Sequence, residues 1–180
     1  MELHENKLRR VNSYSGVIVD VTLDQVELAD KSRSFREVVH HPGGVTILPL
    51  DDEGNVYCVR QFRYPYGEVL LELPAGKLEK GEDPFECAVR ELSEETGFTA
   101  DDWQSLGCIY TSPGYCSETL HLYLARSLHA GRAHLDEGEF LAVERIPLTG
   151  LLERVMEGRI RDGKTVTAVL KAARLLEDKS

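Results

Sequence analysis

Residues 76–98, GKLEKGEDPFECAVRELSEETGF, constrain the fold of this chain more than any other segment. Asp83 is a favourable N-cap, because its side chain can accept a hydrogen bond from a backbone N–H of the first helical turn. Pro84 suits the first helical position, where its missing N–H would have no intrahelical partner. Gly97 suits the left-handed residue that commonly ends a helix. The segment therefore predicts a helix over residues 84–96.

The apolar residues of this helix recur at helical spacing, so they predict one buried stripe. The expected stripe consists of Phe85, Ala88, Val89, Leu92 and Thr96.

An acidic group occupies another face of the same helix. Glu91 and Glu95 are four residues apart, with Glu94 beside them, and like charges at this spacing destabilise an isolated helix. A solvated surface tolerates such a group, but a hard cation such as Mg²⁺ would use it, since such ions prefer oxygen ligands. Arg90 is placed to brace these carboxylates. Together with Gly76 before the helix, the pattern favours a metal site.

The complete spacing resembles the Nudix box, which marks hydrolases of nucleoside diphosphates linked to another group. Seven of its positions each require one residue type, and all seven are filled. The matching residues are Gly76, Glu82, Arg90, Glu91, Leu92, Glu94, Glu95, Gly97 and Phe98.

Composition and net charge argue against some classes of binding partner. The 180 residues include 21 Lys and Arg against 31 Asp and Glu, a net charge of −10. This balance argues against a surface that coats nucleic acid or binds an anionic membrane. The N-terminal segment MELHENKLRR is polar, and no apolar run is long enough to span a bilayer, so a cytoplasmic protein is expected.

The four cysteines form no Cys-x-x-Cys pair, which argues against zinc and disulfides. Cys58, Cys87 and Cys108 are expected to be buried free thiols, and Cys116 to lie in a loop.

Alternating and apolar runs bounded by Gly, Pro, Asn and Asp predict a chain dominated by strands until residue 84 and ending in helices. Strands are expected near 15–22, 25–28, 34–39, 45–50, 56–64, 70–73, 103–111, 120–125 and 140–146, and further helices at 151–157 and 164–176. This order predicts an α/β layered fold with a mixed sheet.

The resemblance implies the Nudix α/β/α sandwich for residues 43–180, with residues 1–42 as a small antiparallel β unit. In relatives that act on ADP-ribose, this unit commonly mediates a dimer. Val17, Val19 and Val21 are expected to alternate onto one strand face and to supply an apolar surface. Alternatively, the same face packs against other residues of its own chain. A homodimer is the preferred interpretation.

Features outside the box resemble the ADP-ribose pyrophosphatase branch. They are residues 60–65 (RQFRYP), residues 71–79 (LELPAGKLE), residues 36–43 (REVVHHPG), Pro113 and the acidic loop of residues 135–140 (LDEGEF). This resemblance implies hydrolysis of ADP-ribose to AMP and ribose 5-phosphate. The alternatives are a Nudix hydrolase of GDP-mannose, another ADP-sugar or a dinucleotide, and a non-catalytic domain that binds ADP-ribose.

The resemblance also implies a set of metal ligands and catalytic residues. Two or three Mg²⁺ ions, for which Mn²⁺ can substitute, would be held by Ala75 (through its carbonyl), Glu91, Glu95 and Glu139. Glu137 would be the general base, while Glu94 would complete the cluster directly or through water and Arg90 would brace it. The roles of Glu137 and Glu139 stay open, since swapped roles or a base from the box fit the same residues.

Two arginines are candidates for the phosphates, because a guanidinium can hold phosphate oxygens with two nitrogen atoms. They are Arg36 and Arg63. Tyr14, Phe35 and Tyr64 are candidates for stacking on the adenine, and the sequence does not choose among them.

Overall fold

The computed structural model describes residues 3–135, 138 and 140–177. The chain divides into two compact units. The first comprises the described residues of 1–43 together with 110–119, and the second comprises the described residues from 44 to 109 and from 120 onward. Each unit is described by itself.

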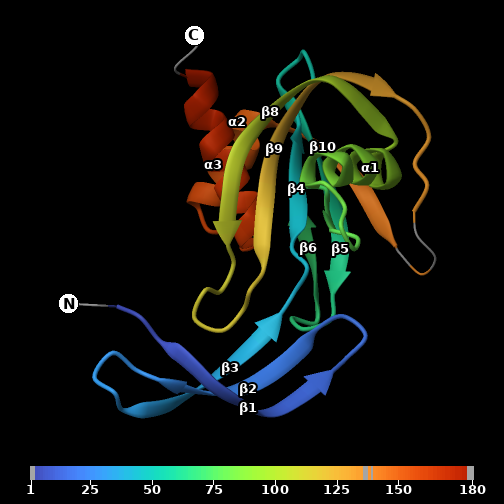
Figure 1. The fold of residues 1–180 in the computed structure, drawn as a ribbon. Helices are drawn as coiled ribbons and strands as arrows, with labels where there is room; N and C mark the ends of the chain where they lie inside the picture. Colours follow the sequence, from blue (N-terminus) through green and yellow to red (C-terminus); the bar gives the residue numbers. More distant parts are fainter. Residues whose placement is uncertain (1–2, 136–137, 139, 178–180) are drawn as a thin grey trace. The chain divides into compact units, whose positions relative to one another are not determined.

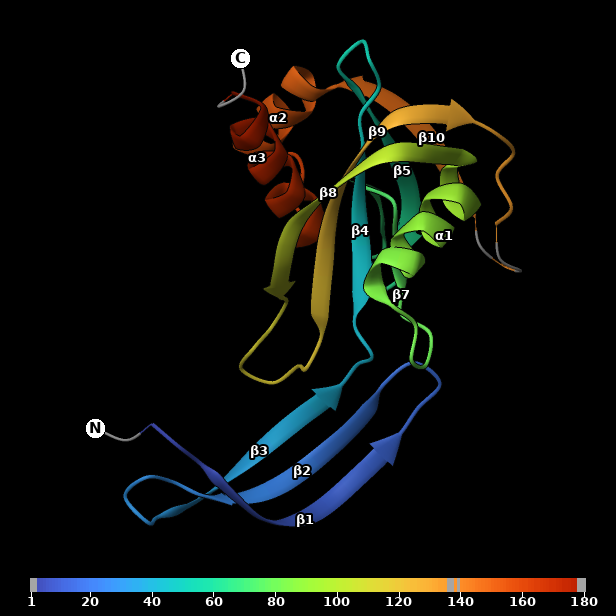
Figure 2. The ribbon, with the colours of Figure 1, turned by 45° about the horizontal axis from the view of Figure 1, so that its top comes forward.

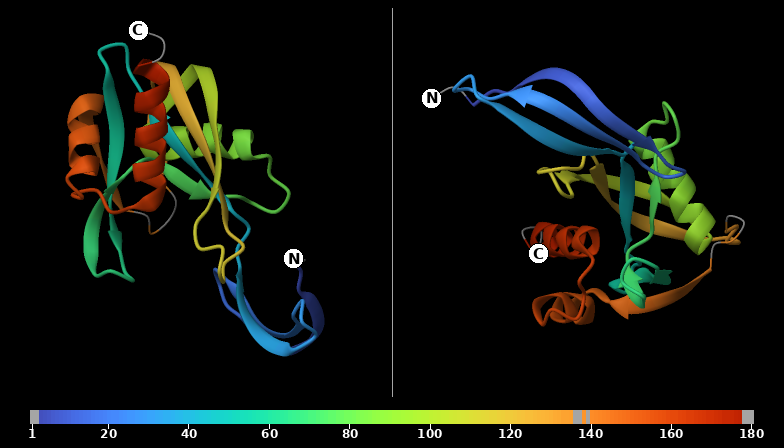
Figure 3. Two further views of the ribbon diagram at one scale, coloured as in Figure 1. Left: turned by 90° about the vertical axis from the view of Figure 1, so that its left-hand side faces the viewer. Right: turned by 90° about the horizontal axis from the view of Figure 1, so that it is seen from below.

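The first unit is built on an antiparallel sheet of three strands, which both views of Figure 3 show as one curved layer. Its strands are β1 (Asn6–Ser15), β2 (Asp20–Glu27) and β3 (Arg33–His40), in the order β1-β2-β3. The loop of residues 112–118 runs beside the end of β3. There the Val39 N–H donates to the Tyr115 carbonyl at 2.7 Å, and the Ser117 N–H donates to the Val39 carbonyl at 2.9 Å.

The expectation of a continuous strand over 15–22 is wrong. The chain turns between β1 and β2, where the Gly16 N–H donates to the Val19 carbonyl at 2.9 Å. Val17 is fully exposed at this turn, so Val17, Val19 and Val21 do not share one strand face. The apolar residues of this segment predicted a strand, but the chain reverses direction at Gly16.

The remaining strands and helices follow in the order shown in Figure 1. The strands are β4 (Gly44–Pro49), β5 (Asn55–Arg63), β6 (Glu68–Glu72), β7 (Ala75–Lys77), β8 (Phe98–Tyr110), β9 (Thr119–Ala130) and β10 (Leu141–Pro147). The helices are α1 (Pro84–Thr96), α2 (Leu148–Met156) and α3 (Gly163–Glu177).

Two sheets form the framework of the second unit. One has the order β7-β4-β9-β8 and is mixed, because β4 pairs parallel with β9 and antiparallel with β7. The other has the order β10-β5-β6 and is antiparallel. The expected α/β fold with a mixed sheet is confirmed.

Strand β4 lies at the centre of this unit, and all six of its residues are buried. Val45 and Ile47 pack with Cys87, Ala88 and Leu92 of α1. Leu48 belongs to a second core, together with residues of α2 and α3. Helix α1 therefore lies on one side of the mixed sheet and helices α2 and α3 on the other, as Figure 2 shows.

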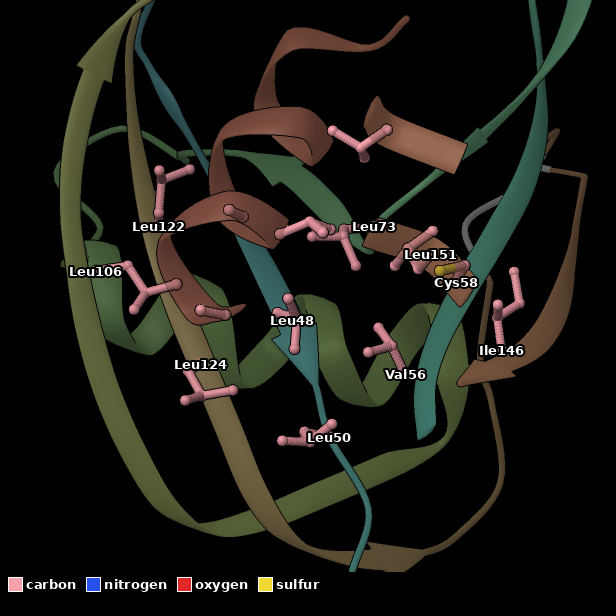
Figure 4. Close-up of a cluster of buried hydrophobic side chains, with 14 of the residues drawn as sticks. Leu48, Leu50, Val56, Cys58, Leu73, Leu106, Leu122, Leu124, Ile146 and Leu151 are labelled. Atoms are coloured by element: carbon pink, nitrogen blue, oxygen red, sulfur yellow. The ribbon is translucent and has the colours of Figure 1, made fainter. Parts of the chain in front are cut away.

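The larger core joins both sheets to these two C-terminal helices. In Figure 4, Leu48, Leu122 and Leu124 from the mixed sheet point into the same space as Val56 and Cys58 of β5. All five side chains are completely buried. Burial of this apolar surface is the main source of stability for such a unit.

Helix α1 begins and ends where the sequence predicts. The Asp83 carboxylate accepts a hydrogen bond from the Phe85 N–H at 2.8 Å, and Gly97 ends the helix in the left-handed conformation with φ 75°. A cap of this kind stabilises a helix by about 1 kcal/mol.

The buried face of α1 differs from the expected stripe. It consists of Cys87, Ala88, Leu92 and Glu95. Phe85 stays 39% exposed, although its ring meets that of Trp103 edge-on at 5.4 Å between centroids. Compared with the expected orientation, α1 is therefore rotated so that part of its acidic side faces the core. The Glu95 carboxylate is buried on a face that the apolar spacing had not assigned to it.

Most other predicted elements are present, with β8 and β9 longer than expected and β1 and β7 unpredicted. Cys58 and Cys87 are buried free thiols as expected, but Cys108 is exposed and its expected burial is wrong. Strand alternation would place Cys108 on the same face as the buried Leu106, but Gly107 between them has φ 85°, which interrupts the alternation and leaves Cys108 exposed. Among the described residues, no helix is long and apolar enough to cross a bilayer.

Candidate functional site

The short segment that leads into α1 is held in place by two parts of the fold, α3 and β4. The Leu73 N–H donates to the Thr165 hydroxyl of α3 at 2.9 Å, and the Pro74 carbonyl accepts from the Ile47 N–H at 2.9 Å. Ala75 then pairs with β4. The backbone at residues 73–75 therefore has a fixed position before the helix begins.

Two glutamates of α1 meet this backbone. Glu95 is 2% exposed, and its carboxylate accepts a hydrogen bond from the Ala75 N–H at 3.0 Å. The Glu91 carboxylate lies against Gly76, where a Cβ would stand 1.8 Å from the Glu91 Cδ. Because the two glutamates are one helical turn apart, both point toward the same pair of residues.

Arg90 holds the neighbouring carboxylates together. Its Nη1 donates to Glu91 and Glu94, each at 2.8 Å, and its Nε donates to Glu82 at 2.9 Å. The pKa of Arg90 is raised, chiefly by its hydrogen bond to Glu82, with Glu91 and Glu94 adding to the effect against the opposing influence of burial. Arg90 therefore stays charged and holds three carboxylates in a fixed arrangement.

Glu82 links this cluster to the loop before α1. Its carboxylate accepts hydrogen bonds from Arg90 and, at 2.8 Å, from the Glu79 N–H. The hydrogen bond from Arg90 is the main reason that the pKa of Glu82 is lowered to about 2, and the Glu79 N–H adds to it. Glu82 thus serves as a brace of the loop and of Arg90.

The donors at this place suit a hard cation. Glu91, Glu95 and the Ala75 carbonyl supply oxygen atoms, and Gly76 leaves the space that the Glu91 carboxylate fills. Within the described part of the chain, no three His, Cys, Asp or Glu side chains already form a complete metal cage. An ion held by Glu91, Glu95 and the Ala75 carbonyl would take its other ligands from water or from a substrate, as Mg²⁺ usually does.

The two candidate phosphate ligands have carboxylate partners. Arg63 in β5 donates to Glu72 of β6 with Nε and Nη2, at 2.8 and 2.7 Å. Arg36, in the first unit, donates to Glu5 with Nε at 2.9 Å and with Nη2 at 2.5 Å. The aromatic candidates Tyr14, Phe35 and Tyr64 are exposed by 66%, 54% and 87%.

Glu137 and Glu139 lie outside the described residues, so their roles stay predictions. The segment that precedes them is tied to the end of α1. The Gly131 N–H donates to the Gly97 carbonyl at 2.7 Å, and the His134 N–H donates to the Glu94 carbonyl at 2.9 Å. A Cβ on Gly97 would lie 2.7 Å from the Ala133 nitrogen, so the close passage of this segment also requires glycine.

The structure thus brings together Ala75, Glu91, Glu94, Glu95 and Arg90. Sequence reasoning did not identify the partners of Arg63, which are Glu72 and, through Glu72, Lys164. The only sequence signal was an acidic residue inside the apolar run of residues 70–73. Lys164 is distant in the chain, so no local pattern pointed to it.

Known proteins resemble this sequence over most of its length. A model of the NUDIX domain family matches residues 40–169. The ADP-ribose pyrophosphatase of Bacillus subtilis is 41% identical over 169 residues, which cover 93% of this chain and 91% of that protein. The methanol dehydrogenase activator of Bacillus methanolicus is 41% identical over 167 residues, covering 92% of this chain and 90% of that protein.

A more distant relative is named for another activity. The GDP-mannose pyrophosphatase of Yersinia enterocolitica is 37% identical over 145 residues, covering 74% of this chain and 75% of that protein. Among solved structures, a crystal structure of an ADP compounds hydrolase has a TM-score of 0.85 and 23% identity, and the match covers 100% of this chain and 98% of that one. This likeness supports the fold.

Proposed function

Because this chain belongs to the Nudix family, we propose that it hydrolyses the diphosphate of ADP-ribose to AMP and ribose 5-phosphate. The observation that carries the proposal is the convergence of Glu91 and Glu95 on Ala75 and Gly76. The choice of ADP-ribose is supported by a 41% identical ADP-ribose pyrophosphatase that matches 93% of the chain, the first unit included.

The reaction adds water across a P–O–P bond. The oxygen of the water bonds to one phosphorus, the bridging oxygen leaves with the other phosphate, and a base takes the proton of the water. Divalent ions supply charge neutralisation of the diphosphate and a lowered pKa for bound water. Ala75, Glu91 and Glu95 would hold them here, with Glu139 as a further ligand.

The other residues of the proposal position groups or move the proton. Glu137 would accept the proton of the attacking water, with the exchange of roles between Glu137 and Glu139, or a base from the box, as the alternatives. Arg90 keeps Glu91 and Glu94 oriented through its hydrogen bonds. Arg63 and Arg36 would each bind phosphate oxygens.

GDP-mannose is the runner-up substrate, since a relative at 37% identity is named for its hydrolysis. Specificity constants for ADP-ribose, GDP-mannose, NADH and ATP, measured side by side with Mg²⁺, separate the two. We expect kcat/KM to be highest for ADP-ribose. A higher value for GDP-mannose would replace the proposed substrate, and no turnover of any of the four would favour a binding role.

Three finer points are part of the same proposal. Mg²⁺ is the proposed metal, in two or three ions, with Mn²⁺ as a substitute. The protein is proposed to be a homodimer, which the exposed apolar residues Val11, Val17 and Ile18 of the first unit support. A cytoplasmic location is proposed because all four cysteines are free thiols, as expected in a reducing compartment.

A further inference from the structure

A carboxylate is buried at the end of β6, three residues before Ala75. Glu72 is 1% exposed, and it is held by two cations. Arg63 donates to both of its oxygens, and the Lys164 Nζ donates to Oε2 as well. Burial alone would raise the pKa of Glu72, but the hydrogen bonds and charges of Arg63 and Lys164 lower it. Glu72 is therefore a buried anion.

The second cation is fixed by the start of α3. Lys164 is 11% exposed and also contacts the Asp162 carboxylate at 2.9 Å. Asp162 accepts from the N–H of Thr165 at 3.1 Å and from its hydroxyl at 2.6 Å. The Thr165 hydroxyl in turn accepts from the Leu73 N–H. Lys164 is therefore held in place beside Glu72, where it shares the Oε2 atom with Arg63 Nη2.

Exposure rises from Glu72 toward Arg63, whose side chain is 37% exposed. The contact with Glu72 uses Nε and Nη2, and Nη1 is the nitrogen that it does not use. Arg63 is bound to Glu72, three residues before Ala75, so this guanidinium contacts the chain just ahead of the candidate metal site. An anion approaching from solvent meets Arg63, while Glu72 and Lys164 lie behind it.

We infer that Glu72 is a positioning residue, which fixes the plane of the Arg63 guanidinium so that Nη1 faces the diphosphate of the substrate. The inference rests on the proposed function and extends it to a residue that touches no substrate. A guanidinium held at two nitrogen atoms loses little further conformational entropy when it binds phosphate. Lys164 keeps Glu72 charged and in place.

The test measures binding separately from turnover. The probe is the α,β-methylene analogue of ADP-ribose, whose P–C–P bridge cannot be hydrolysed, titrated with Mg²⁺ into the full chain. We expect Glu72→Gln to weaken binding about tenfold and to raise KM more than it lowers kcat. Arg63→Ala should weaken binding by at least as much. The double variant should bind no more weakly than Arg63→Ala, because Glu72 acts through Arg63.

Several results would overturn the inference. One is a Glu72→Gln variant that binds the analogue with wild-type affinity. Another is a double variant whose loss of binding free energy equals the sum of the two single losses, since this would show that Glu72 acts independently of Arg63. If Glu72→Gln does not fold, the Arg63→Lys variant provides the test. Lysine keeps the positive charge but cannot make the two-nitrogen contact with Glu72, so we expect it to lose nearly as much affinity for the analogue as Arg63→Ala. Wild-type binding by Arg63→Lys would refute the positioning role.

A matched control and a second probe complete the design. Glu144→Gln removes another carboxylate that pairs with arginines, Arg60 at 2.6 Å and Arg154 at 3.4 Å, and should bind the analogue like the wild type. Inorganic pyrophosphate presents a diphosphate without nucleoside or ribose. If the wild type does not cleave ADP-ribose but pyrophosphate binding shows the same non-additive losses, the inference stands and the proposed function fails.

Discussion

The carboxylate of Glu91 occupies the space that a side chain on Gly76 would need. A Cβ on Gly76 would lie 1.8 Å from both the Cδ and the Oε1 of Glu91, far inside van der Waals contact. Gly76 and Glu91 are fifteen positions apart in the sequence. The glycine that opens the box is therefore explained by the glutamate of α1 that it accommodates.

Gly76→Ala should displace Glu91 and with it a candidate metal ligand. We expect kcat/KM for ADP-ribose to fall at least about 100-fold, because a displaced ligand no longer stabilises the charge that develops in the reaction. Steady-state kinetics with Mg²⁺ measure this loss. Gly150→Ala is the matched control: beyond its chain neighbours and the nearby backbone of its own helix, no atom lies within 4 Å of the added Cβ, so activity should be retained.

Glu95→Gln tests the charge of the buried carboxylate without removing its shape. The amide oxygen can still accept the hydrogen bond from the Ala75 N–H, so the fold should persist. The lost charge should reduce turnover about 100-fold or more and weaken binding of Mn²⁺. Titration of Mn²⁺ by electron paramagnetic resonance, together with kinetics, checks both. Unchanged turnover would remove Glu95 from the metal site.

The ion pair between Glu82 and Arg90 should make stability depend on pH. The pKa of Glu82 is lowered from 4.5 to about 2. Its contribution is therefore fully present above about pH 4.5 and lost as pH falls toward 2. Glu82→Gln should lower the free energy of unfolding at pH 7, and this difference should shrink between pH 4.5 and 3. Denaturant unfolding of both proteins across this range measures it, and a difference independent of pH would contradict the account.

Thr165→Val tests the link between α3 and the segment that leads into the box. Thr165 is completely buried, and valine would leave the Leu73 N–H without its acceptor. A buried donor without a partner costs about 1–3 kcal/mol, which urea unfolding would detect. Thr167→Val removes an exposed hydroxyl of the same helix, one that donates to the Gly163 carbonyl. Its effect should be smaller, and equal losses would argue against a special role for Thr165.

The local parts of the fold and the site were predictable because their signals are local. Asp83, Pro84 and Gly97 predicted the bounds of α1, since capping depends on neighbouring residues. Spacing along one helix likewise predicted that Glu91 and Glu95 would share a face and that Arg90 would brace the carboxylates beside it.

The missed features depend on contacts that are distant in the sequence. Glu72 and Lys164 are 92 residues apart, so no periodicity could pair them. The turn at Gly16 was missed because apolar residues continue through it. Glu95 was not assigned to the buried face because its burial depends on a hydrogen bond from the Ala75 backbone, which is distant in the sequence. Local pattern thus predicted the elements and which carboxylates share a face of α1, while tertiary contacts determine which charges are buried and how they are held.

Formation of AMP from ADP-ribose, followed by chromatography with Mg²⁺ and with excess chelator, tests the central claim most directly. The account predicts equal amounts of AMP and ribose 5-phosphate with Mg²⁺ and neither product with the chelator. The same rate with chelator, or no product with Mg²⁺, would contradict it.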